Sequence, residues 1–274
     1  MQLLSNLGLP LISNKKLLKI SKAWFVTAFI GQILFALYLL IHYLMNGVLG
    51  NLDKWSESST GAIVEGDAIG NVSFLIHITL ALIVTIGGPL QLIPIVRRRY
   101  PKFHRINGCI YVISGILISL VGFYLIWVRG TAGDTKAHVM TTINGILIII
   151  TAIMTMKKAI SRNIDQHQKW AIRLFISMSG VYFFRVFLNF WLILSQGKGI
   201  DFDSFTGPAI DAVNVASYIL PLLVLEFCFR AYDTENKSLK LMSFGLVVSL
   251  IFVFLIGVFG AFTFMWWPFI SKAG

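Results

Sequence analysis

The chain has 274 residues, of which 57% are hydrophobic and only 13% are charged, and its formal net charge is +11 at pH 7. A soluble domain carries roughly 25% charged residues, so this chain lacks the polar side chains needed to cover a globule in water. The composition therefore excludes a soluble globular protein and indicates an integral membrane protein.

Seven apolar runs predict seven membrane-spanning helices. A helix needs about 20 apolar residues to cross a hydrocarbon core of ~30 Å, and the runs lack the period-2 alternation of barrel strands. Helices satisfy their backbone hydrogen bonds internally, so we expect an all-α integral membrane protein. The predicted spans are residues 23–45, 72–96, 107–128, 139–157, 170–195, 212–229 and 241–267.

The two ends of the chain define the domain organisation. Residues 1–22 are apolar and then basic, which predicts an interfacial helix that holds anionic lipid headgroups. The run 23–45 is longer than the apolar region of a signal peptide, and no small-residue cleavage site follows it, so we expect a retained span. Near the other end, Trp266 and Trp267 are predicted in the outer aromatic belt. No connection is long enough to fold alone, so residues 1–274 form one polytopic domain.

The distribution of charge predicts the orientation. Seventeen of the 23 Lys and Arg side chains lie before span 1 or around the connections between spans 2 and 3, 4 and 5, and 6 and 7. Positive residues mark the cytoplasmic face, so the N-terminus is predicted inside and the C-terminus outside. Because the Lys and Arg side chains are divided among several membrane connections, we expect no nucleic-acid partner. Their placement instead predicts contact with the anionic lipid headgroups of the cytoplasmic leaflet.

A faint internal repeat relates spans 2 and 3 to spans 4 and 5. Each hairpin has a histidine at the outer end of its first helix, His77 or His138, and another near the inner end of its second helix, His104 or His167. The spacings within the two hairpins are 27 and 29 residues. We therefore predict that residues 72–195 form an up-down four-helix bundle of two hairpins related by an axis along the membrane normal.

The four histidines predict haem ligation. In such a bundle spans 2 and 4 lie diagonally across the core, as do spans 3 and 5. His77 with His138, and His104 with His167, could then each supply two axial nitrogens to a haem b. A structural alternative stays open, because a histidine at a membrane boundary also caps helices or contacts lipid phosphates.

Two further features are compatible with haem. Arg105 and Arg173, with Lys102, could neutralise propionates near the inner face. Seven glycines in spans 2 to 5 could leave room for a flat macrocycle, at positions 87, 88, 108, 115, 122, 145 and 180.

Arg185, in "VYFFRVFLNFW", is the costliest side chain in the sequence. A charge within a span costs at least about 2.5 kcal/mol on insertion scales, so Arg185 should face the protein interior and have a partner. Asp211 or Asn214, or the anionic group of a ligand, could fill that role. Glu226 and Arg230 are spaced i,i+4 and are predicted to form a local ion pair.

A set of motifs carries a family resemblance. In chain order the motifs are His77, Gly87-Gly88-Pro89-x-Gln91, His104-Arg105-x-x-Gly108-x-x-Tyr111, His167-x-x-Trp170-x-x-Arg173 and Arg185. With these motifs the chain resembles a bacterial family of predicted multi-pass membrane proteins of unknown function, which implies a multi-pass bundle in the bacterial cytoplasmic membrane and no known activity. Gln168 and Ala171 depart from the family's usual basic residue and Met, and His138 is outside the family pattern, which favours the inner histidine pair as haem ligands. The layout is more weakly similar to diheme b-type transmembrane cytochromes.

Three functions stay open at this point. The first is a b-type haem-binding transmembrane electron-transfer protein. The second is a non-redox carrier or sensor in which His77, Gln91 and Arg185 bind a small polar, quinone-like or lipid molecule. The third is a membrane scaffold or assembly factor without a site. Motifs for zinc proteases, P-loops and serine hydrolases are missing from the sequence, so no catalytic residue is predicted.

Overall fold

The computed structural model describes residues 13–59, 61–131 and 133–271, and it confirms the predicted all-α integral membrane protein. Six helices in these ranges are long and apolar enough to cross a membrane, and a bent pair makes seven if it counts as one span. The elements are α1 (Asn14–Tyr38), η2 (Leu39–Met45), α2 (Asn46–Val48), α3 (Asp53–Ser58), α4 (Ala68–Leu92), α5 (Pro94–Arg99), α6 (Pro101–Tyr124), η3 (Leu125–Arg129), α7 (Thr135–Ile160), α8 (Ile164–Met178), α9 (Gly180–Ser195), α10 (Pro208–Tyr232), α11 (Lys237–Gly260), η4 (Ala261–Trp266) and α12 (Trp267–Ile270).

Span 1 begins well before its apolar run. The hydroxyl of Ser13 accepts a hydrogen bond from the backbone N–H of Lys16 (3.3 Å), which caps α1 at its first turn. The predicted interfacial lead comprises residues 1–22. Its second part, from Asn14 onward, is therefore continuous with the span and is not a separate interfacial helix. Its first part, residues 1–12, lies outside the described residues.

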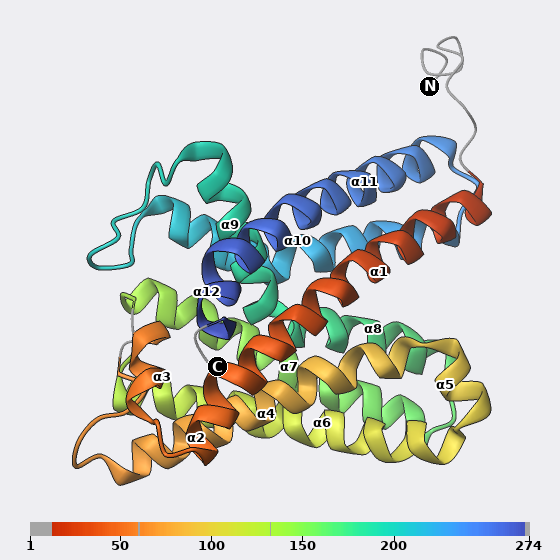
Figure 1. Cartoon of the computed structure of the whole chain (residues 1–274). Coiled ribbons are helices and arrows are strands. Elements are labelled where there is room, and N and C mark those ends of the chain that lie inside the picture. Colours follow the sequence, from red (N-terminus) through yellow and green to blue (C-terminus); the bar gives the residue numbers. More distant parts are fainter. Residues whose placement is uncertain (1–12, 60, 132, 272–274) are drawn as a thin grey trace.

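The helices form two groups (Figure 1). The lower group in this view contains α4, α6, α7 and α8, which pack in chain order, and the upper group contains α1, α9, α10 and α11. The groups meet where α1 packs on α4 and where α10 packs on α7 and α8. The predicted four-helix bundle is thus the lower group, but its fourth member is only the first half of the fifth span.

The connections divide between two ends of the molecule. The basic end, on the right in Figure 1, contains the start of α1, α5 with Arg97, Arg98 and Arg99, and the turn between α10 and α11. The opposite end, here called the loop end, contains α2, α3 and the loop between α9 and α10. This division is the one that the charge pattern requires, while the cytoplasmic location of the basic end stays a prediction.

The fifth span is bent at Ser179. α8 ends at Met178 and α9 begins at Gly180, and the two helices are inclined by 55°. Ser and Gly together are a common cause of sharp kinks. Gln32 of α1 also donates a hydrogen bond from Nε2 to the hydroxyl of Ser179 (2.9 Å), which holds the bend from outside. Because of the bend, α9 leaves the lower group and packs on α10 and α11.

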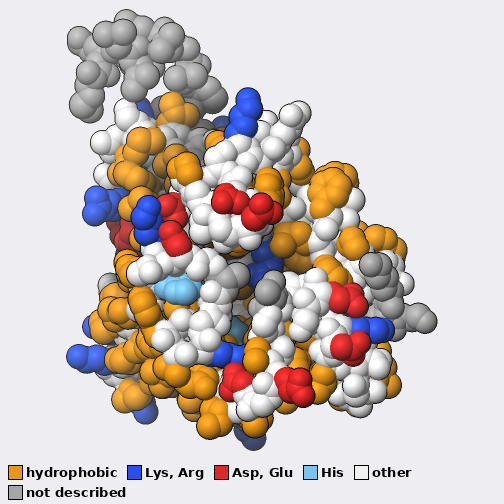
Figure 2. Space-filling model, turned by 90° about the vertical axis from the view of Figure 1, so that its left-hand side faces the viewer, with side chains coloured by type: hydrophobic (Ala, Val, Ile, Leu, Met, Phe, Trp, Pro, Cys, Tyr) orange, Lys and Arg blue, Asp and Glu red, His pale blue; other side chains and the backbone are white. Residues whose placement is uncertain are grey.

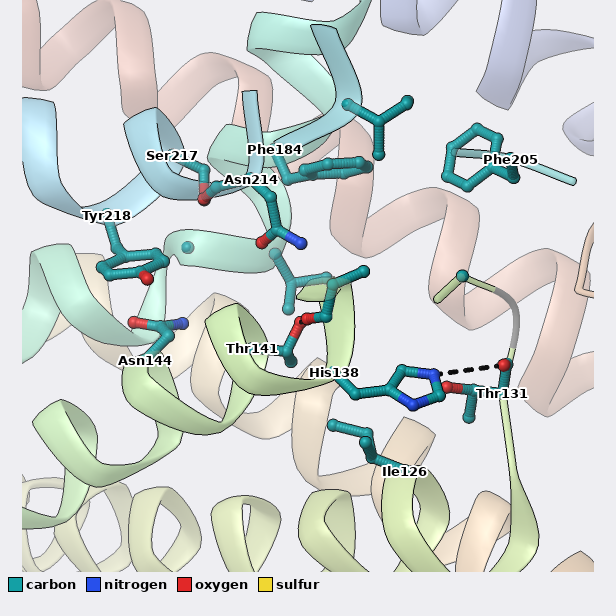
Figure 3. A pocket seen from close by; sticks show the side chains of 15 residues that line it. Ile126, Thr131, His138, Thr141, Asn144, Phe184, Phe205, Asn214, Ser217 and Tyr218 are labelled. Carbon is teal, nitrogen blue, oxygen red and sulfur yellow. Dashed lines mark hydrogen bonds between the residues drawn. The ribbon is translucent and has the colours of Figure 1, made fainter. Parts of the chain in front are cut away.

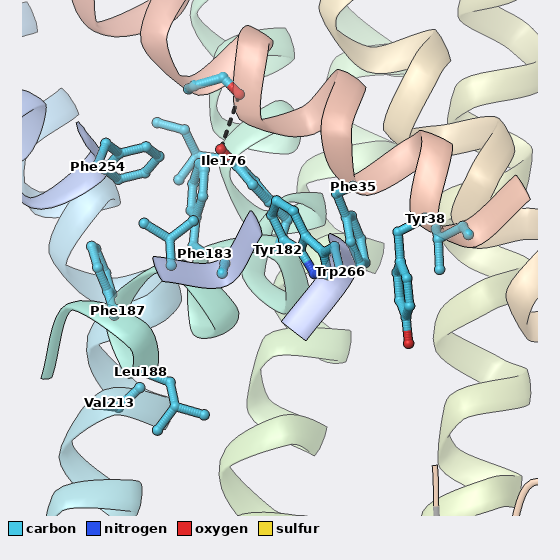
Figure 4. Close-up of a cluster of buried hydrophobic side chains, with 14 of the residues drawn as sticks. Phe35, Tyr38, Ile176, Tyr182, Phe183, Phe187, Leu188, Val213, Phe254 and Trp266 are labelled. Atoms are coloured by element: carbon cyan, nitrogen blue, oxygen red, sulfur yellow. Dashed lines mark hydrogen bonds between the residues drawn. The ribbon is translucent and has the colours of Figure 1, made fainter. Parts of the chain in front are cut away.

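The main buried cluster lies in the upper group, between α1, α9 and α11 (Figure 4). Phe183 and Phe254 are fully buried and meet edge to face, with ring centroids 5.0 Å apart. The prediction that Trp266 lies in the aromatic belt is wrong, because η4 packs on α1 and places the indole 5.5 Å from the ring of Phe35. Trp267 is exposed, as expected for a belt residue.

Arg129 ties the long 46–71 connection to the lower group. Its side chain is only 6% exposed and forms an ion pair with Asp67 (Nε to Oδ2, 3.0 Å). The same guanidinium donates to the carbonyl oxygens of Ala62 and Gly70 and to Oδ1 of Asn71. Asp67 also caps α4 through the N–H of Gly70. The connection is therefore held by a network of charge-assisted hydrogen bonds instead of a core of its own.

The contact between α9 and α11 gives a test of the packing. Gly257 of α11 leaves no space for a methyl group, because the Cβ would collide with the carbonyl oxygen of Val186. Gly257→Ala should destabilise the protein by about 1–3 kcal/mol, since overpacking forces two helices apart. Gly245 lies in the same helix with nothing within 4 Å of its added Cβ, so Gly245→Ala should leave the thermal midpoint unchanged or raise it slightly. Equal effects of the two substitutions on thermal unfolding in detergent would contradict this packing.

Candidate functional site

The two inner histidines both lie at the basic end of the lower group, His104 in the first turn of α6 and His167 in the first turn of α8. Nδ1 of His167 lies 3.1 Å from the carbonyl oxygen of Thr155, whereas Nδ1 of His104 is buried and has no partner among the described residues. That the two histidines share a height and face one another stays a prediction.

The side chains around this pair do not fit a haem b. The interior of the lower group is filled by a hydrophobic cluster that includes Tyr111, Val112 and Leu174. Within residues 13–59, 61–131 and 133–271, no group of three or more His, Cys, Asp or Glu could hold a metal. Protein side chains also fill the space beside every glycine that was predicted to admit a macrocycle: Gly87, Gly88, Gly108, Gly115, Gly122, Gly145 and Gly180 face Asn107, Tyr111, Gln91, Met178, His77, Phe123 and Asn144 respectively.

The two outer histidines have different surroundings. The ring of His77 of α4 packs beside Gly122 of α6, and its Nδ1 is buried without a partner among the described residues. His138 of α7 lies near the loop end, where its ring packs edge to face on Trp127 and its Nε2 lies 3.3 Å from the carbonyl oxygen of Thr131. Each histidine therefore belongs to a separate local environment, and their pairing on one haem stays a prediction.

Arg185 has one hydrogen bond in the described part of the chain, from Nη1 to the carbonyl oxygen of Val181 one turn earlier (3.1 Å). Its guanidinium carbon lies 5.1 Å from the centre of the Phe35 ring. Neither Asp211 nor Asn214, the protein partners that the sequence suggested, forms an ion pair or hydrogen bond with it among these residues. Arg185 thus remains a candidate ligand-binding residue.

The prediction of an ion pair between Glu226 and Arg230 is wrong. Glu226 of α10 instead accepts two hydrogen bonds from Arg173 of α8, at 2.6 and 3.0 Å. Arg173 also lies over the rings of Trp170 and Phe229. A bidentate pair between helices is stronger than an i,i+4 pair on one helix face, and its geometry depends on tertiary packing. Arg173 therefore joins the two helix groups, and Glu226 occupies its Nε and one of its Nη2 donors.

The other two candidate ligand residues are at the basic end. Gln91 donates from Nε2 to the carbonyl oxygen of His104 (3.2 Å) and fills the space beside Gly108, so it closes the turn between α4 and α6. It does not join His77 and Arg185 in one pocket. Arg105 is exposed, which suits the headgroup contact that the charge pattern predicts.

A cavity of about 200 Å³ lies between the two helix groups at the loop end (Figure 3). Its walls come from α7 with His138, Thr141 and Asn144, from α9 with Gly180, and from α10 with Tyr218. The loop end itself carries acidic and basic side chains among apolar ones (Figure 2), as is expected of a face that meets water or lipid headgroups.

Most polar groups of the cavity wall already have partners. Thr141 donates its hydroxyl to the carbonyl oxygen of Ala137, and Tyr218 donates to that of Met140. Asn144 is different, since it is only 7% exposed and its Oδ1 has no partner among the described residues. In Figure 3 the amides of Asn144 and Asn214 both lie at the space between α7 and α10. The cavity therefore presents a buried acceptor that no donor among the described residues satisfies.

The sequence singled out His138, Gly180 and Asn214, each for another role, but not the rest of this cavity. The available signal was an asparagine within an apolar run, as in "INGILIII" and "DAVNVASYIL". Buried polar side chains within spans are costly and mark functional positions. That signal does not say which spans face each other, because the contact of α7 with α10 depends on the bend in the fifth span.

The comparison with known sequences agrees with the membrane setting. Residues 74–229, more than half of the chain, match the family described as predicted membrane protein (DUF2306). Neither a curated protein nor a solved structure matches the chain. The matched region extends from α4 into α10 and so includes the inner histidines, Arg185 and most of the cavity wall.

Substitution can decide between the observed ion pair of Glu226 with Arg173 and the predicted pair of Glu226 with Arg230. Arg173→Gln should lower the stability by about 1–2 kcal/mol, equivalent to roughly 2–6 °C in thermal midpoint, because it leaves the Glu226 carboxylate without its bidentate partner. Arg230→Gln is the matched control and should shift the midpoint by less than about 1 °C. A larger effect of Arg230→Gln than of Arg173→Gln in thermal unfolding would restore the local pair.

Proposed function

The chain belongs to the DUF2306 family of predicted membrane proteins, and we propose that it acts there as a non-redox carrier or sensor for a small neutral ring molecule. The observation that carries this proposal is the loop-end cavity with the unpartnered Oδ1 of Asn144. The ligand reaches the cavity from the loop end, the predicted external side.

The size and walls of the cavity indicate the class of ligand. An engineered apolar cavity of about 150 Å³ binds benzene, so a cavity of about 200 Å³ suits one six-membered ring with small substituents. Phe184, Phe205 and Tyr218 supply aromatic surface for such a ring. No Lys, Arg, Asp or Glu is among the described lining residues, which favours an uncharged molecule.

Asn144 specifies a hydrogen-bond donor on that ring. A buried acceptor without a partner costs about 1–3 kcal/mol, and a ligand hydroxyl or N–H recovers this cost on binding. A ligand without a donor leaves Oδ1 unsatisfied and gains only from apolar burial. The reduced, hydroxyl-bearing form of a quinone-like head is one member of this class.

The bend in the fifth span supports a carrier or sensor role. Gly180 and Val181, at the start of α9, line the cavity next to Ser179. Discontinuous helices line the substrate sites of many transporters, where a half-helix moves relative to its partner. A ligand that contacts α7, α9 and α10 together would favour one angle between α8 and α9, and this coupling is what a carrier or a sensor requires.

The proposal is tested with hydroquinone and 1,4-dimethoxybenzene, two ring probes of which only the first carries donors. Hydroquinone should raise the thermal midpoint of the detergent-purified protein by about 3–6 °C at tenfold excess over its Kd. At the same concentration, 1,4-dimethoxybenzene should give a smaller shift of the thermal midpoint. Equal shifts with both probes, or none with either, would contradict a donor-specific site.

Asn144→Leu keeps the number of side-chain heavy atoms but removes the acceptor. It should abolish the advantage of hydroquinone and raise the stability of the ligand-free protein by about 1 kcal/mol, because an unsatisfied buried acceptor is removed. Thr141→Val is the matched control, since the Thr141 hydroxyl is occupied within its own helix. This variant should keep the preference for hydroquinone.

Electron transfer through haem b is the second candidate, and only the position of His104 and His167 at the same end of the lower group favours it. Haem ligation would require Tyr111 and its cluster to vacate the interior of the lower group. We expect the protein purified after expression with a haem precursor to lack a Soret band. A Soret band that His104→Ala removes would reverse the order of the two candidates.

A further inference from the structure

The loop-end cavity contains a second carboxamide besides that of Asn144. Asn214 of α10 lines the cavity and is half-buried, so its side chain borders accessible space. The hydroxyl of Ser217 donates to the backbone carbonyl oxygen of Asn214 (2.7 Å), while the side-chain amide of Asn214 has no partner among the described residues. In Figure 3 this amide lies at the space between α7 and α10. The amide therefore keeps both its N–H donors and its acceptor for a ligand.

The other polar side chains that α7 and α10 contribute to the wall have already used their donors. Nε2 of His138 lies 3.3 Å from the carbonyl oxygen of Thr131, so a neutral imidazole that donates there keeps no further N–H. Each hydroxyl from these two helices donates to a backbone carbonyl oxygen at 2.7–3.1 Å, namely those of Thr141, Ser217 and Tyr218. Among the described lining residues of α7 and α10, the unused N–H donors thus belong to the two asparagines.

The two asparagines lie at different depths in the cavity. The hydroxyl of Tyr218 donates to the carbonyl oxygen of Met140 (3.1 Å), which ties α10 to α7. Tyr218 lies one helical turn after Asn214, and Met140 lies one turn before Asn144. Both helices begin at the loop end (Figure 1), so Asn144 is the deeper of the two and Asn214 is nearer the loop end. The two amides therefore meet different edges of one bound ring.

A carboxamide matches a particular ligand edge. It presents an N–H and a C=O side by side, and the complementary edge is an N–H beside a C=O, which forms two parallel hydrogen bonds with it. Asparagine binds the edge of adenine in the same bidentate manner. A phenolic hydroxyl can use only part of this capacity. No Lys, Arg, Asp or Glu is among the described lining residues, so the edge belongs to a neutral molecule.

We propose that the ligand is a neutral pyrimidine dione of the uracil class, and that Asn214 binds one of its N–H/C=O edges while Asn144 accepts from its second N–H. This proposal rests on the proposed function, because the same cavity holds the ring. It assigns to Asn214 the selection among rings that carry a donor. Phe184, Phe205 and Tyr218 supply the aromatic surface on which such a planar base packs.

The probes are uracil, 1,3-dimethyluracil and phenol, and the dissociation constant of each comes from the thermal midpoint of the detergent-purified protein at increasing probe concentration. Wild type should bind 1,3-dimethyluracil about tenfold or more weakly than uracil, although the methyl groups make it more apolar, because both N–H donors are lost. Phenol carries a single hydroxyl, so its binding depends on Asn144 and not on the amide of Asn214.

Asn214→Leu assigns the edge to its residue. It should weaken uracil binding about tenfold or more and change phenol binding less than about threefold, so that phenol shows the cavity to be intact. Thr141→Val is the matched control and should keep both affinities, since its hydroxyl is occupied within α7. Equal losses of uracil and phenol in Asn214→Leu, or no loss of uracil, would overturn the proposal.

Two further outcomes separate this proposal from the proposed function. If hydroquinone and phenol bind to wild type and uracil does not, the pyrimidine dione is ruled out and the donor-specific ring site stands. If none of these rings binds, the proposed function fails and this proposal fails with it. Should Asn214→Leu not fold, wild-type binding of 1,3-dimethyluracil as tight as that of uracil would overturn the proposal.

Discussion

The bend at Ser179 is the feature on which the arrangement of the helices toward the loop end depends. Inside a bilayer each backbone N–H and C=O needs a partner within the protein, so a helix can break there only where other groups replace the lost bonds. The N–H of Ser179 still reaches the carbonyl oxygens of Phe175 and Ile176, and its carbonyl oxygen accepts from the N–H of Phe183. Gln32 holds the hydroxyl. The backbone N–H and C=O of Ser179 therefore keep their hydrogen bonds at the break. The change of direction places α9 in the upper helix group instead of the lower one.

This transfer explains why polar atoms without partners gather near the middle of the molecule. Once α9 leaves the lower group, Asn144 of α7 faces Gly180 instead of a continuous helix, and the space between α7 and α10 opens into the cavity. Oε1 of Gln32 and the hydroxyl of Ser177 are also buried without described partners around the bend. Each such atom costs about 1–3 kcal/mol, and a fold that retains several of them in one region stores free energy that a ligand can recover.

The sequence predicts the spans well and the bend poorly, for a physical reason. Long apolar runs determine which segments cross the membrane, because lipid leaves the backbone few alternatives. The pair Ser114-Gly115 in α6 has the same composition as Ser179-Gly180, yet α6 continues as a helix through it. At Gly115 the neighbour is the side chain of Met178, whereas at Ser179 a glutamine from α1 supplies a hydrogen bond. The difference lies in partners far away in the chain, so local pattern cannot distinguish the two sites.

The partners of the arginines also depend on tertiary packing that a local sequence pattern does not reveal. Arg129, Arg173 and Arg185 all occur near the apolar runs, and the sequence could not say which of them has an acid beside it. Tertiary packing gives Arg129 the carboxylate of Asp67 and gives Arg173 that of Glu226. Both of these pairs hold elements together, one at the loop end and one between the helix groups. Arg185 is left with a backbone carbonyl and an aromatic ring, so its conformation does not account for its charge. Arg185 is half-buried within its span and has no carboxylate partner among the described residues, which separates it from the two arginines that hold elements together.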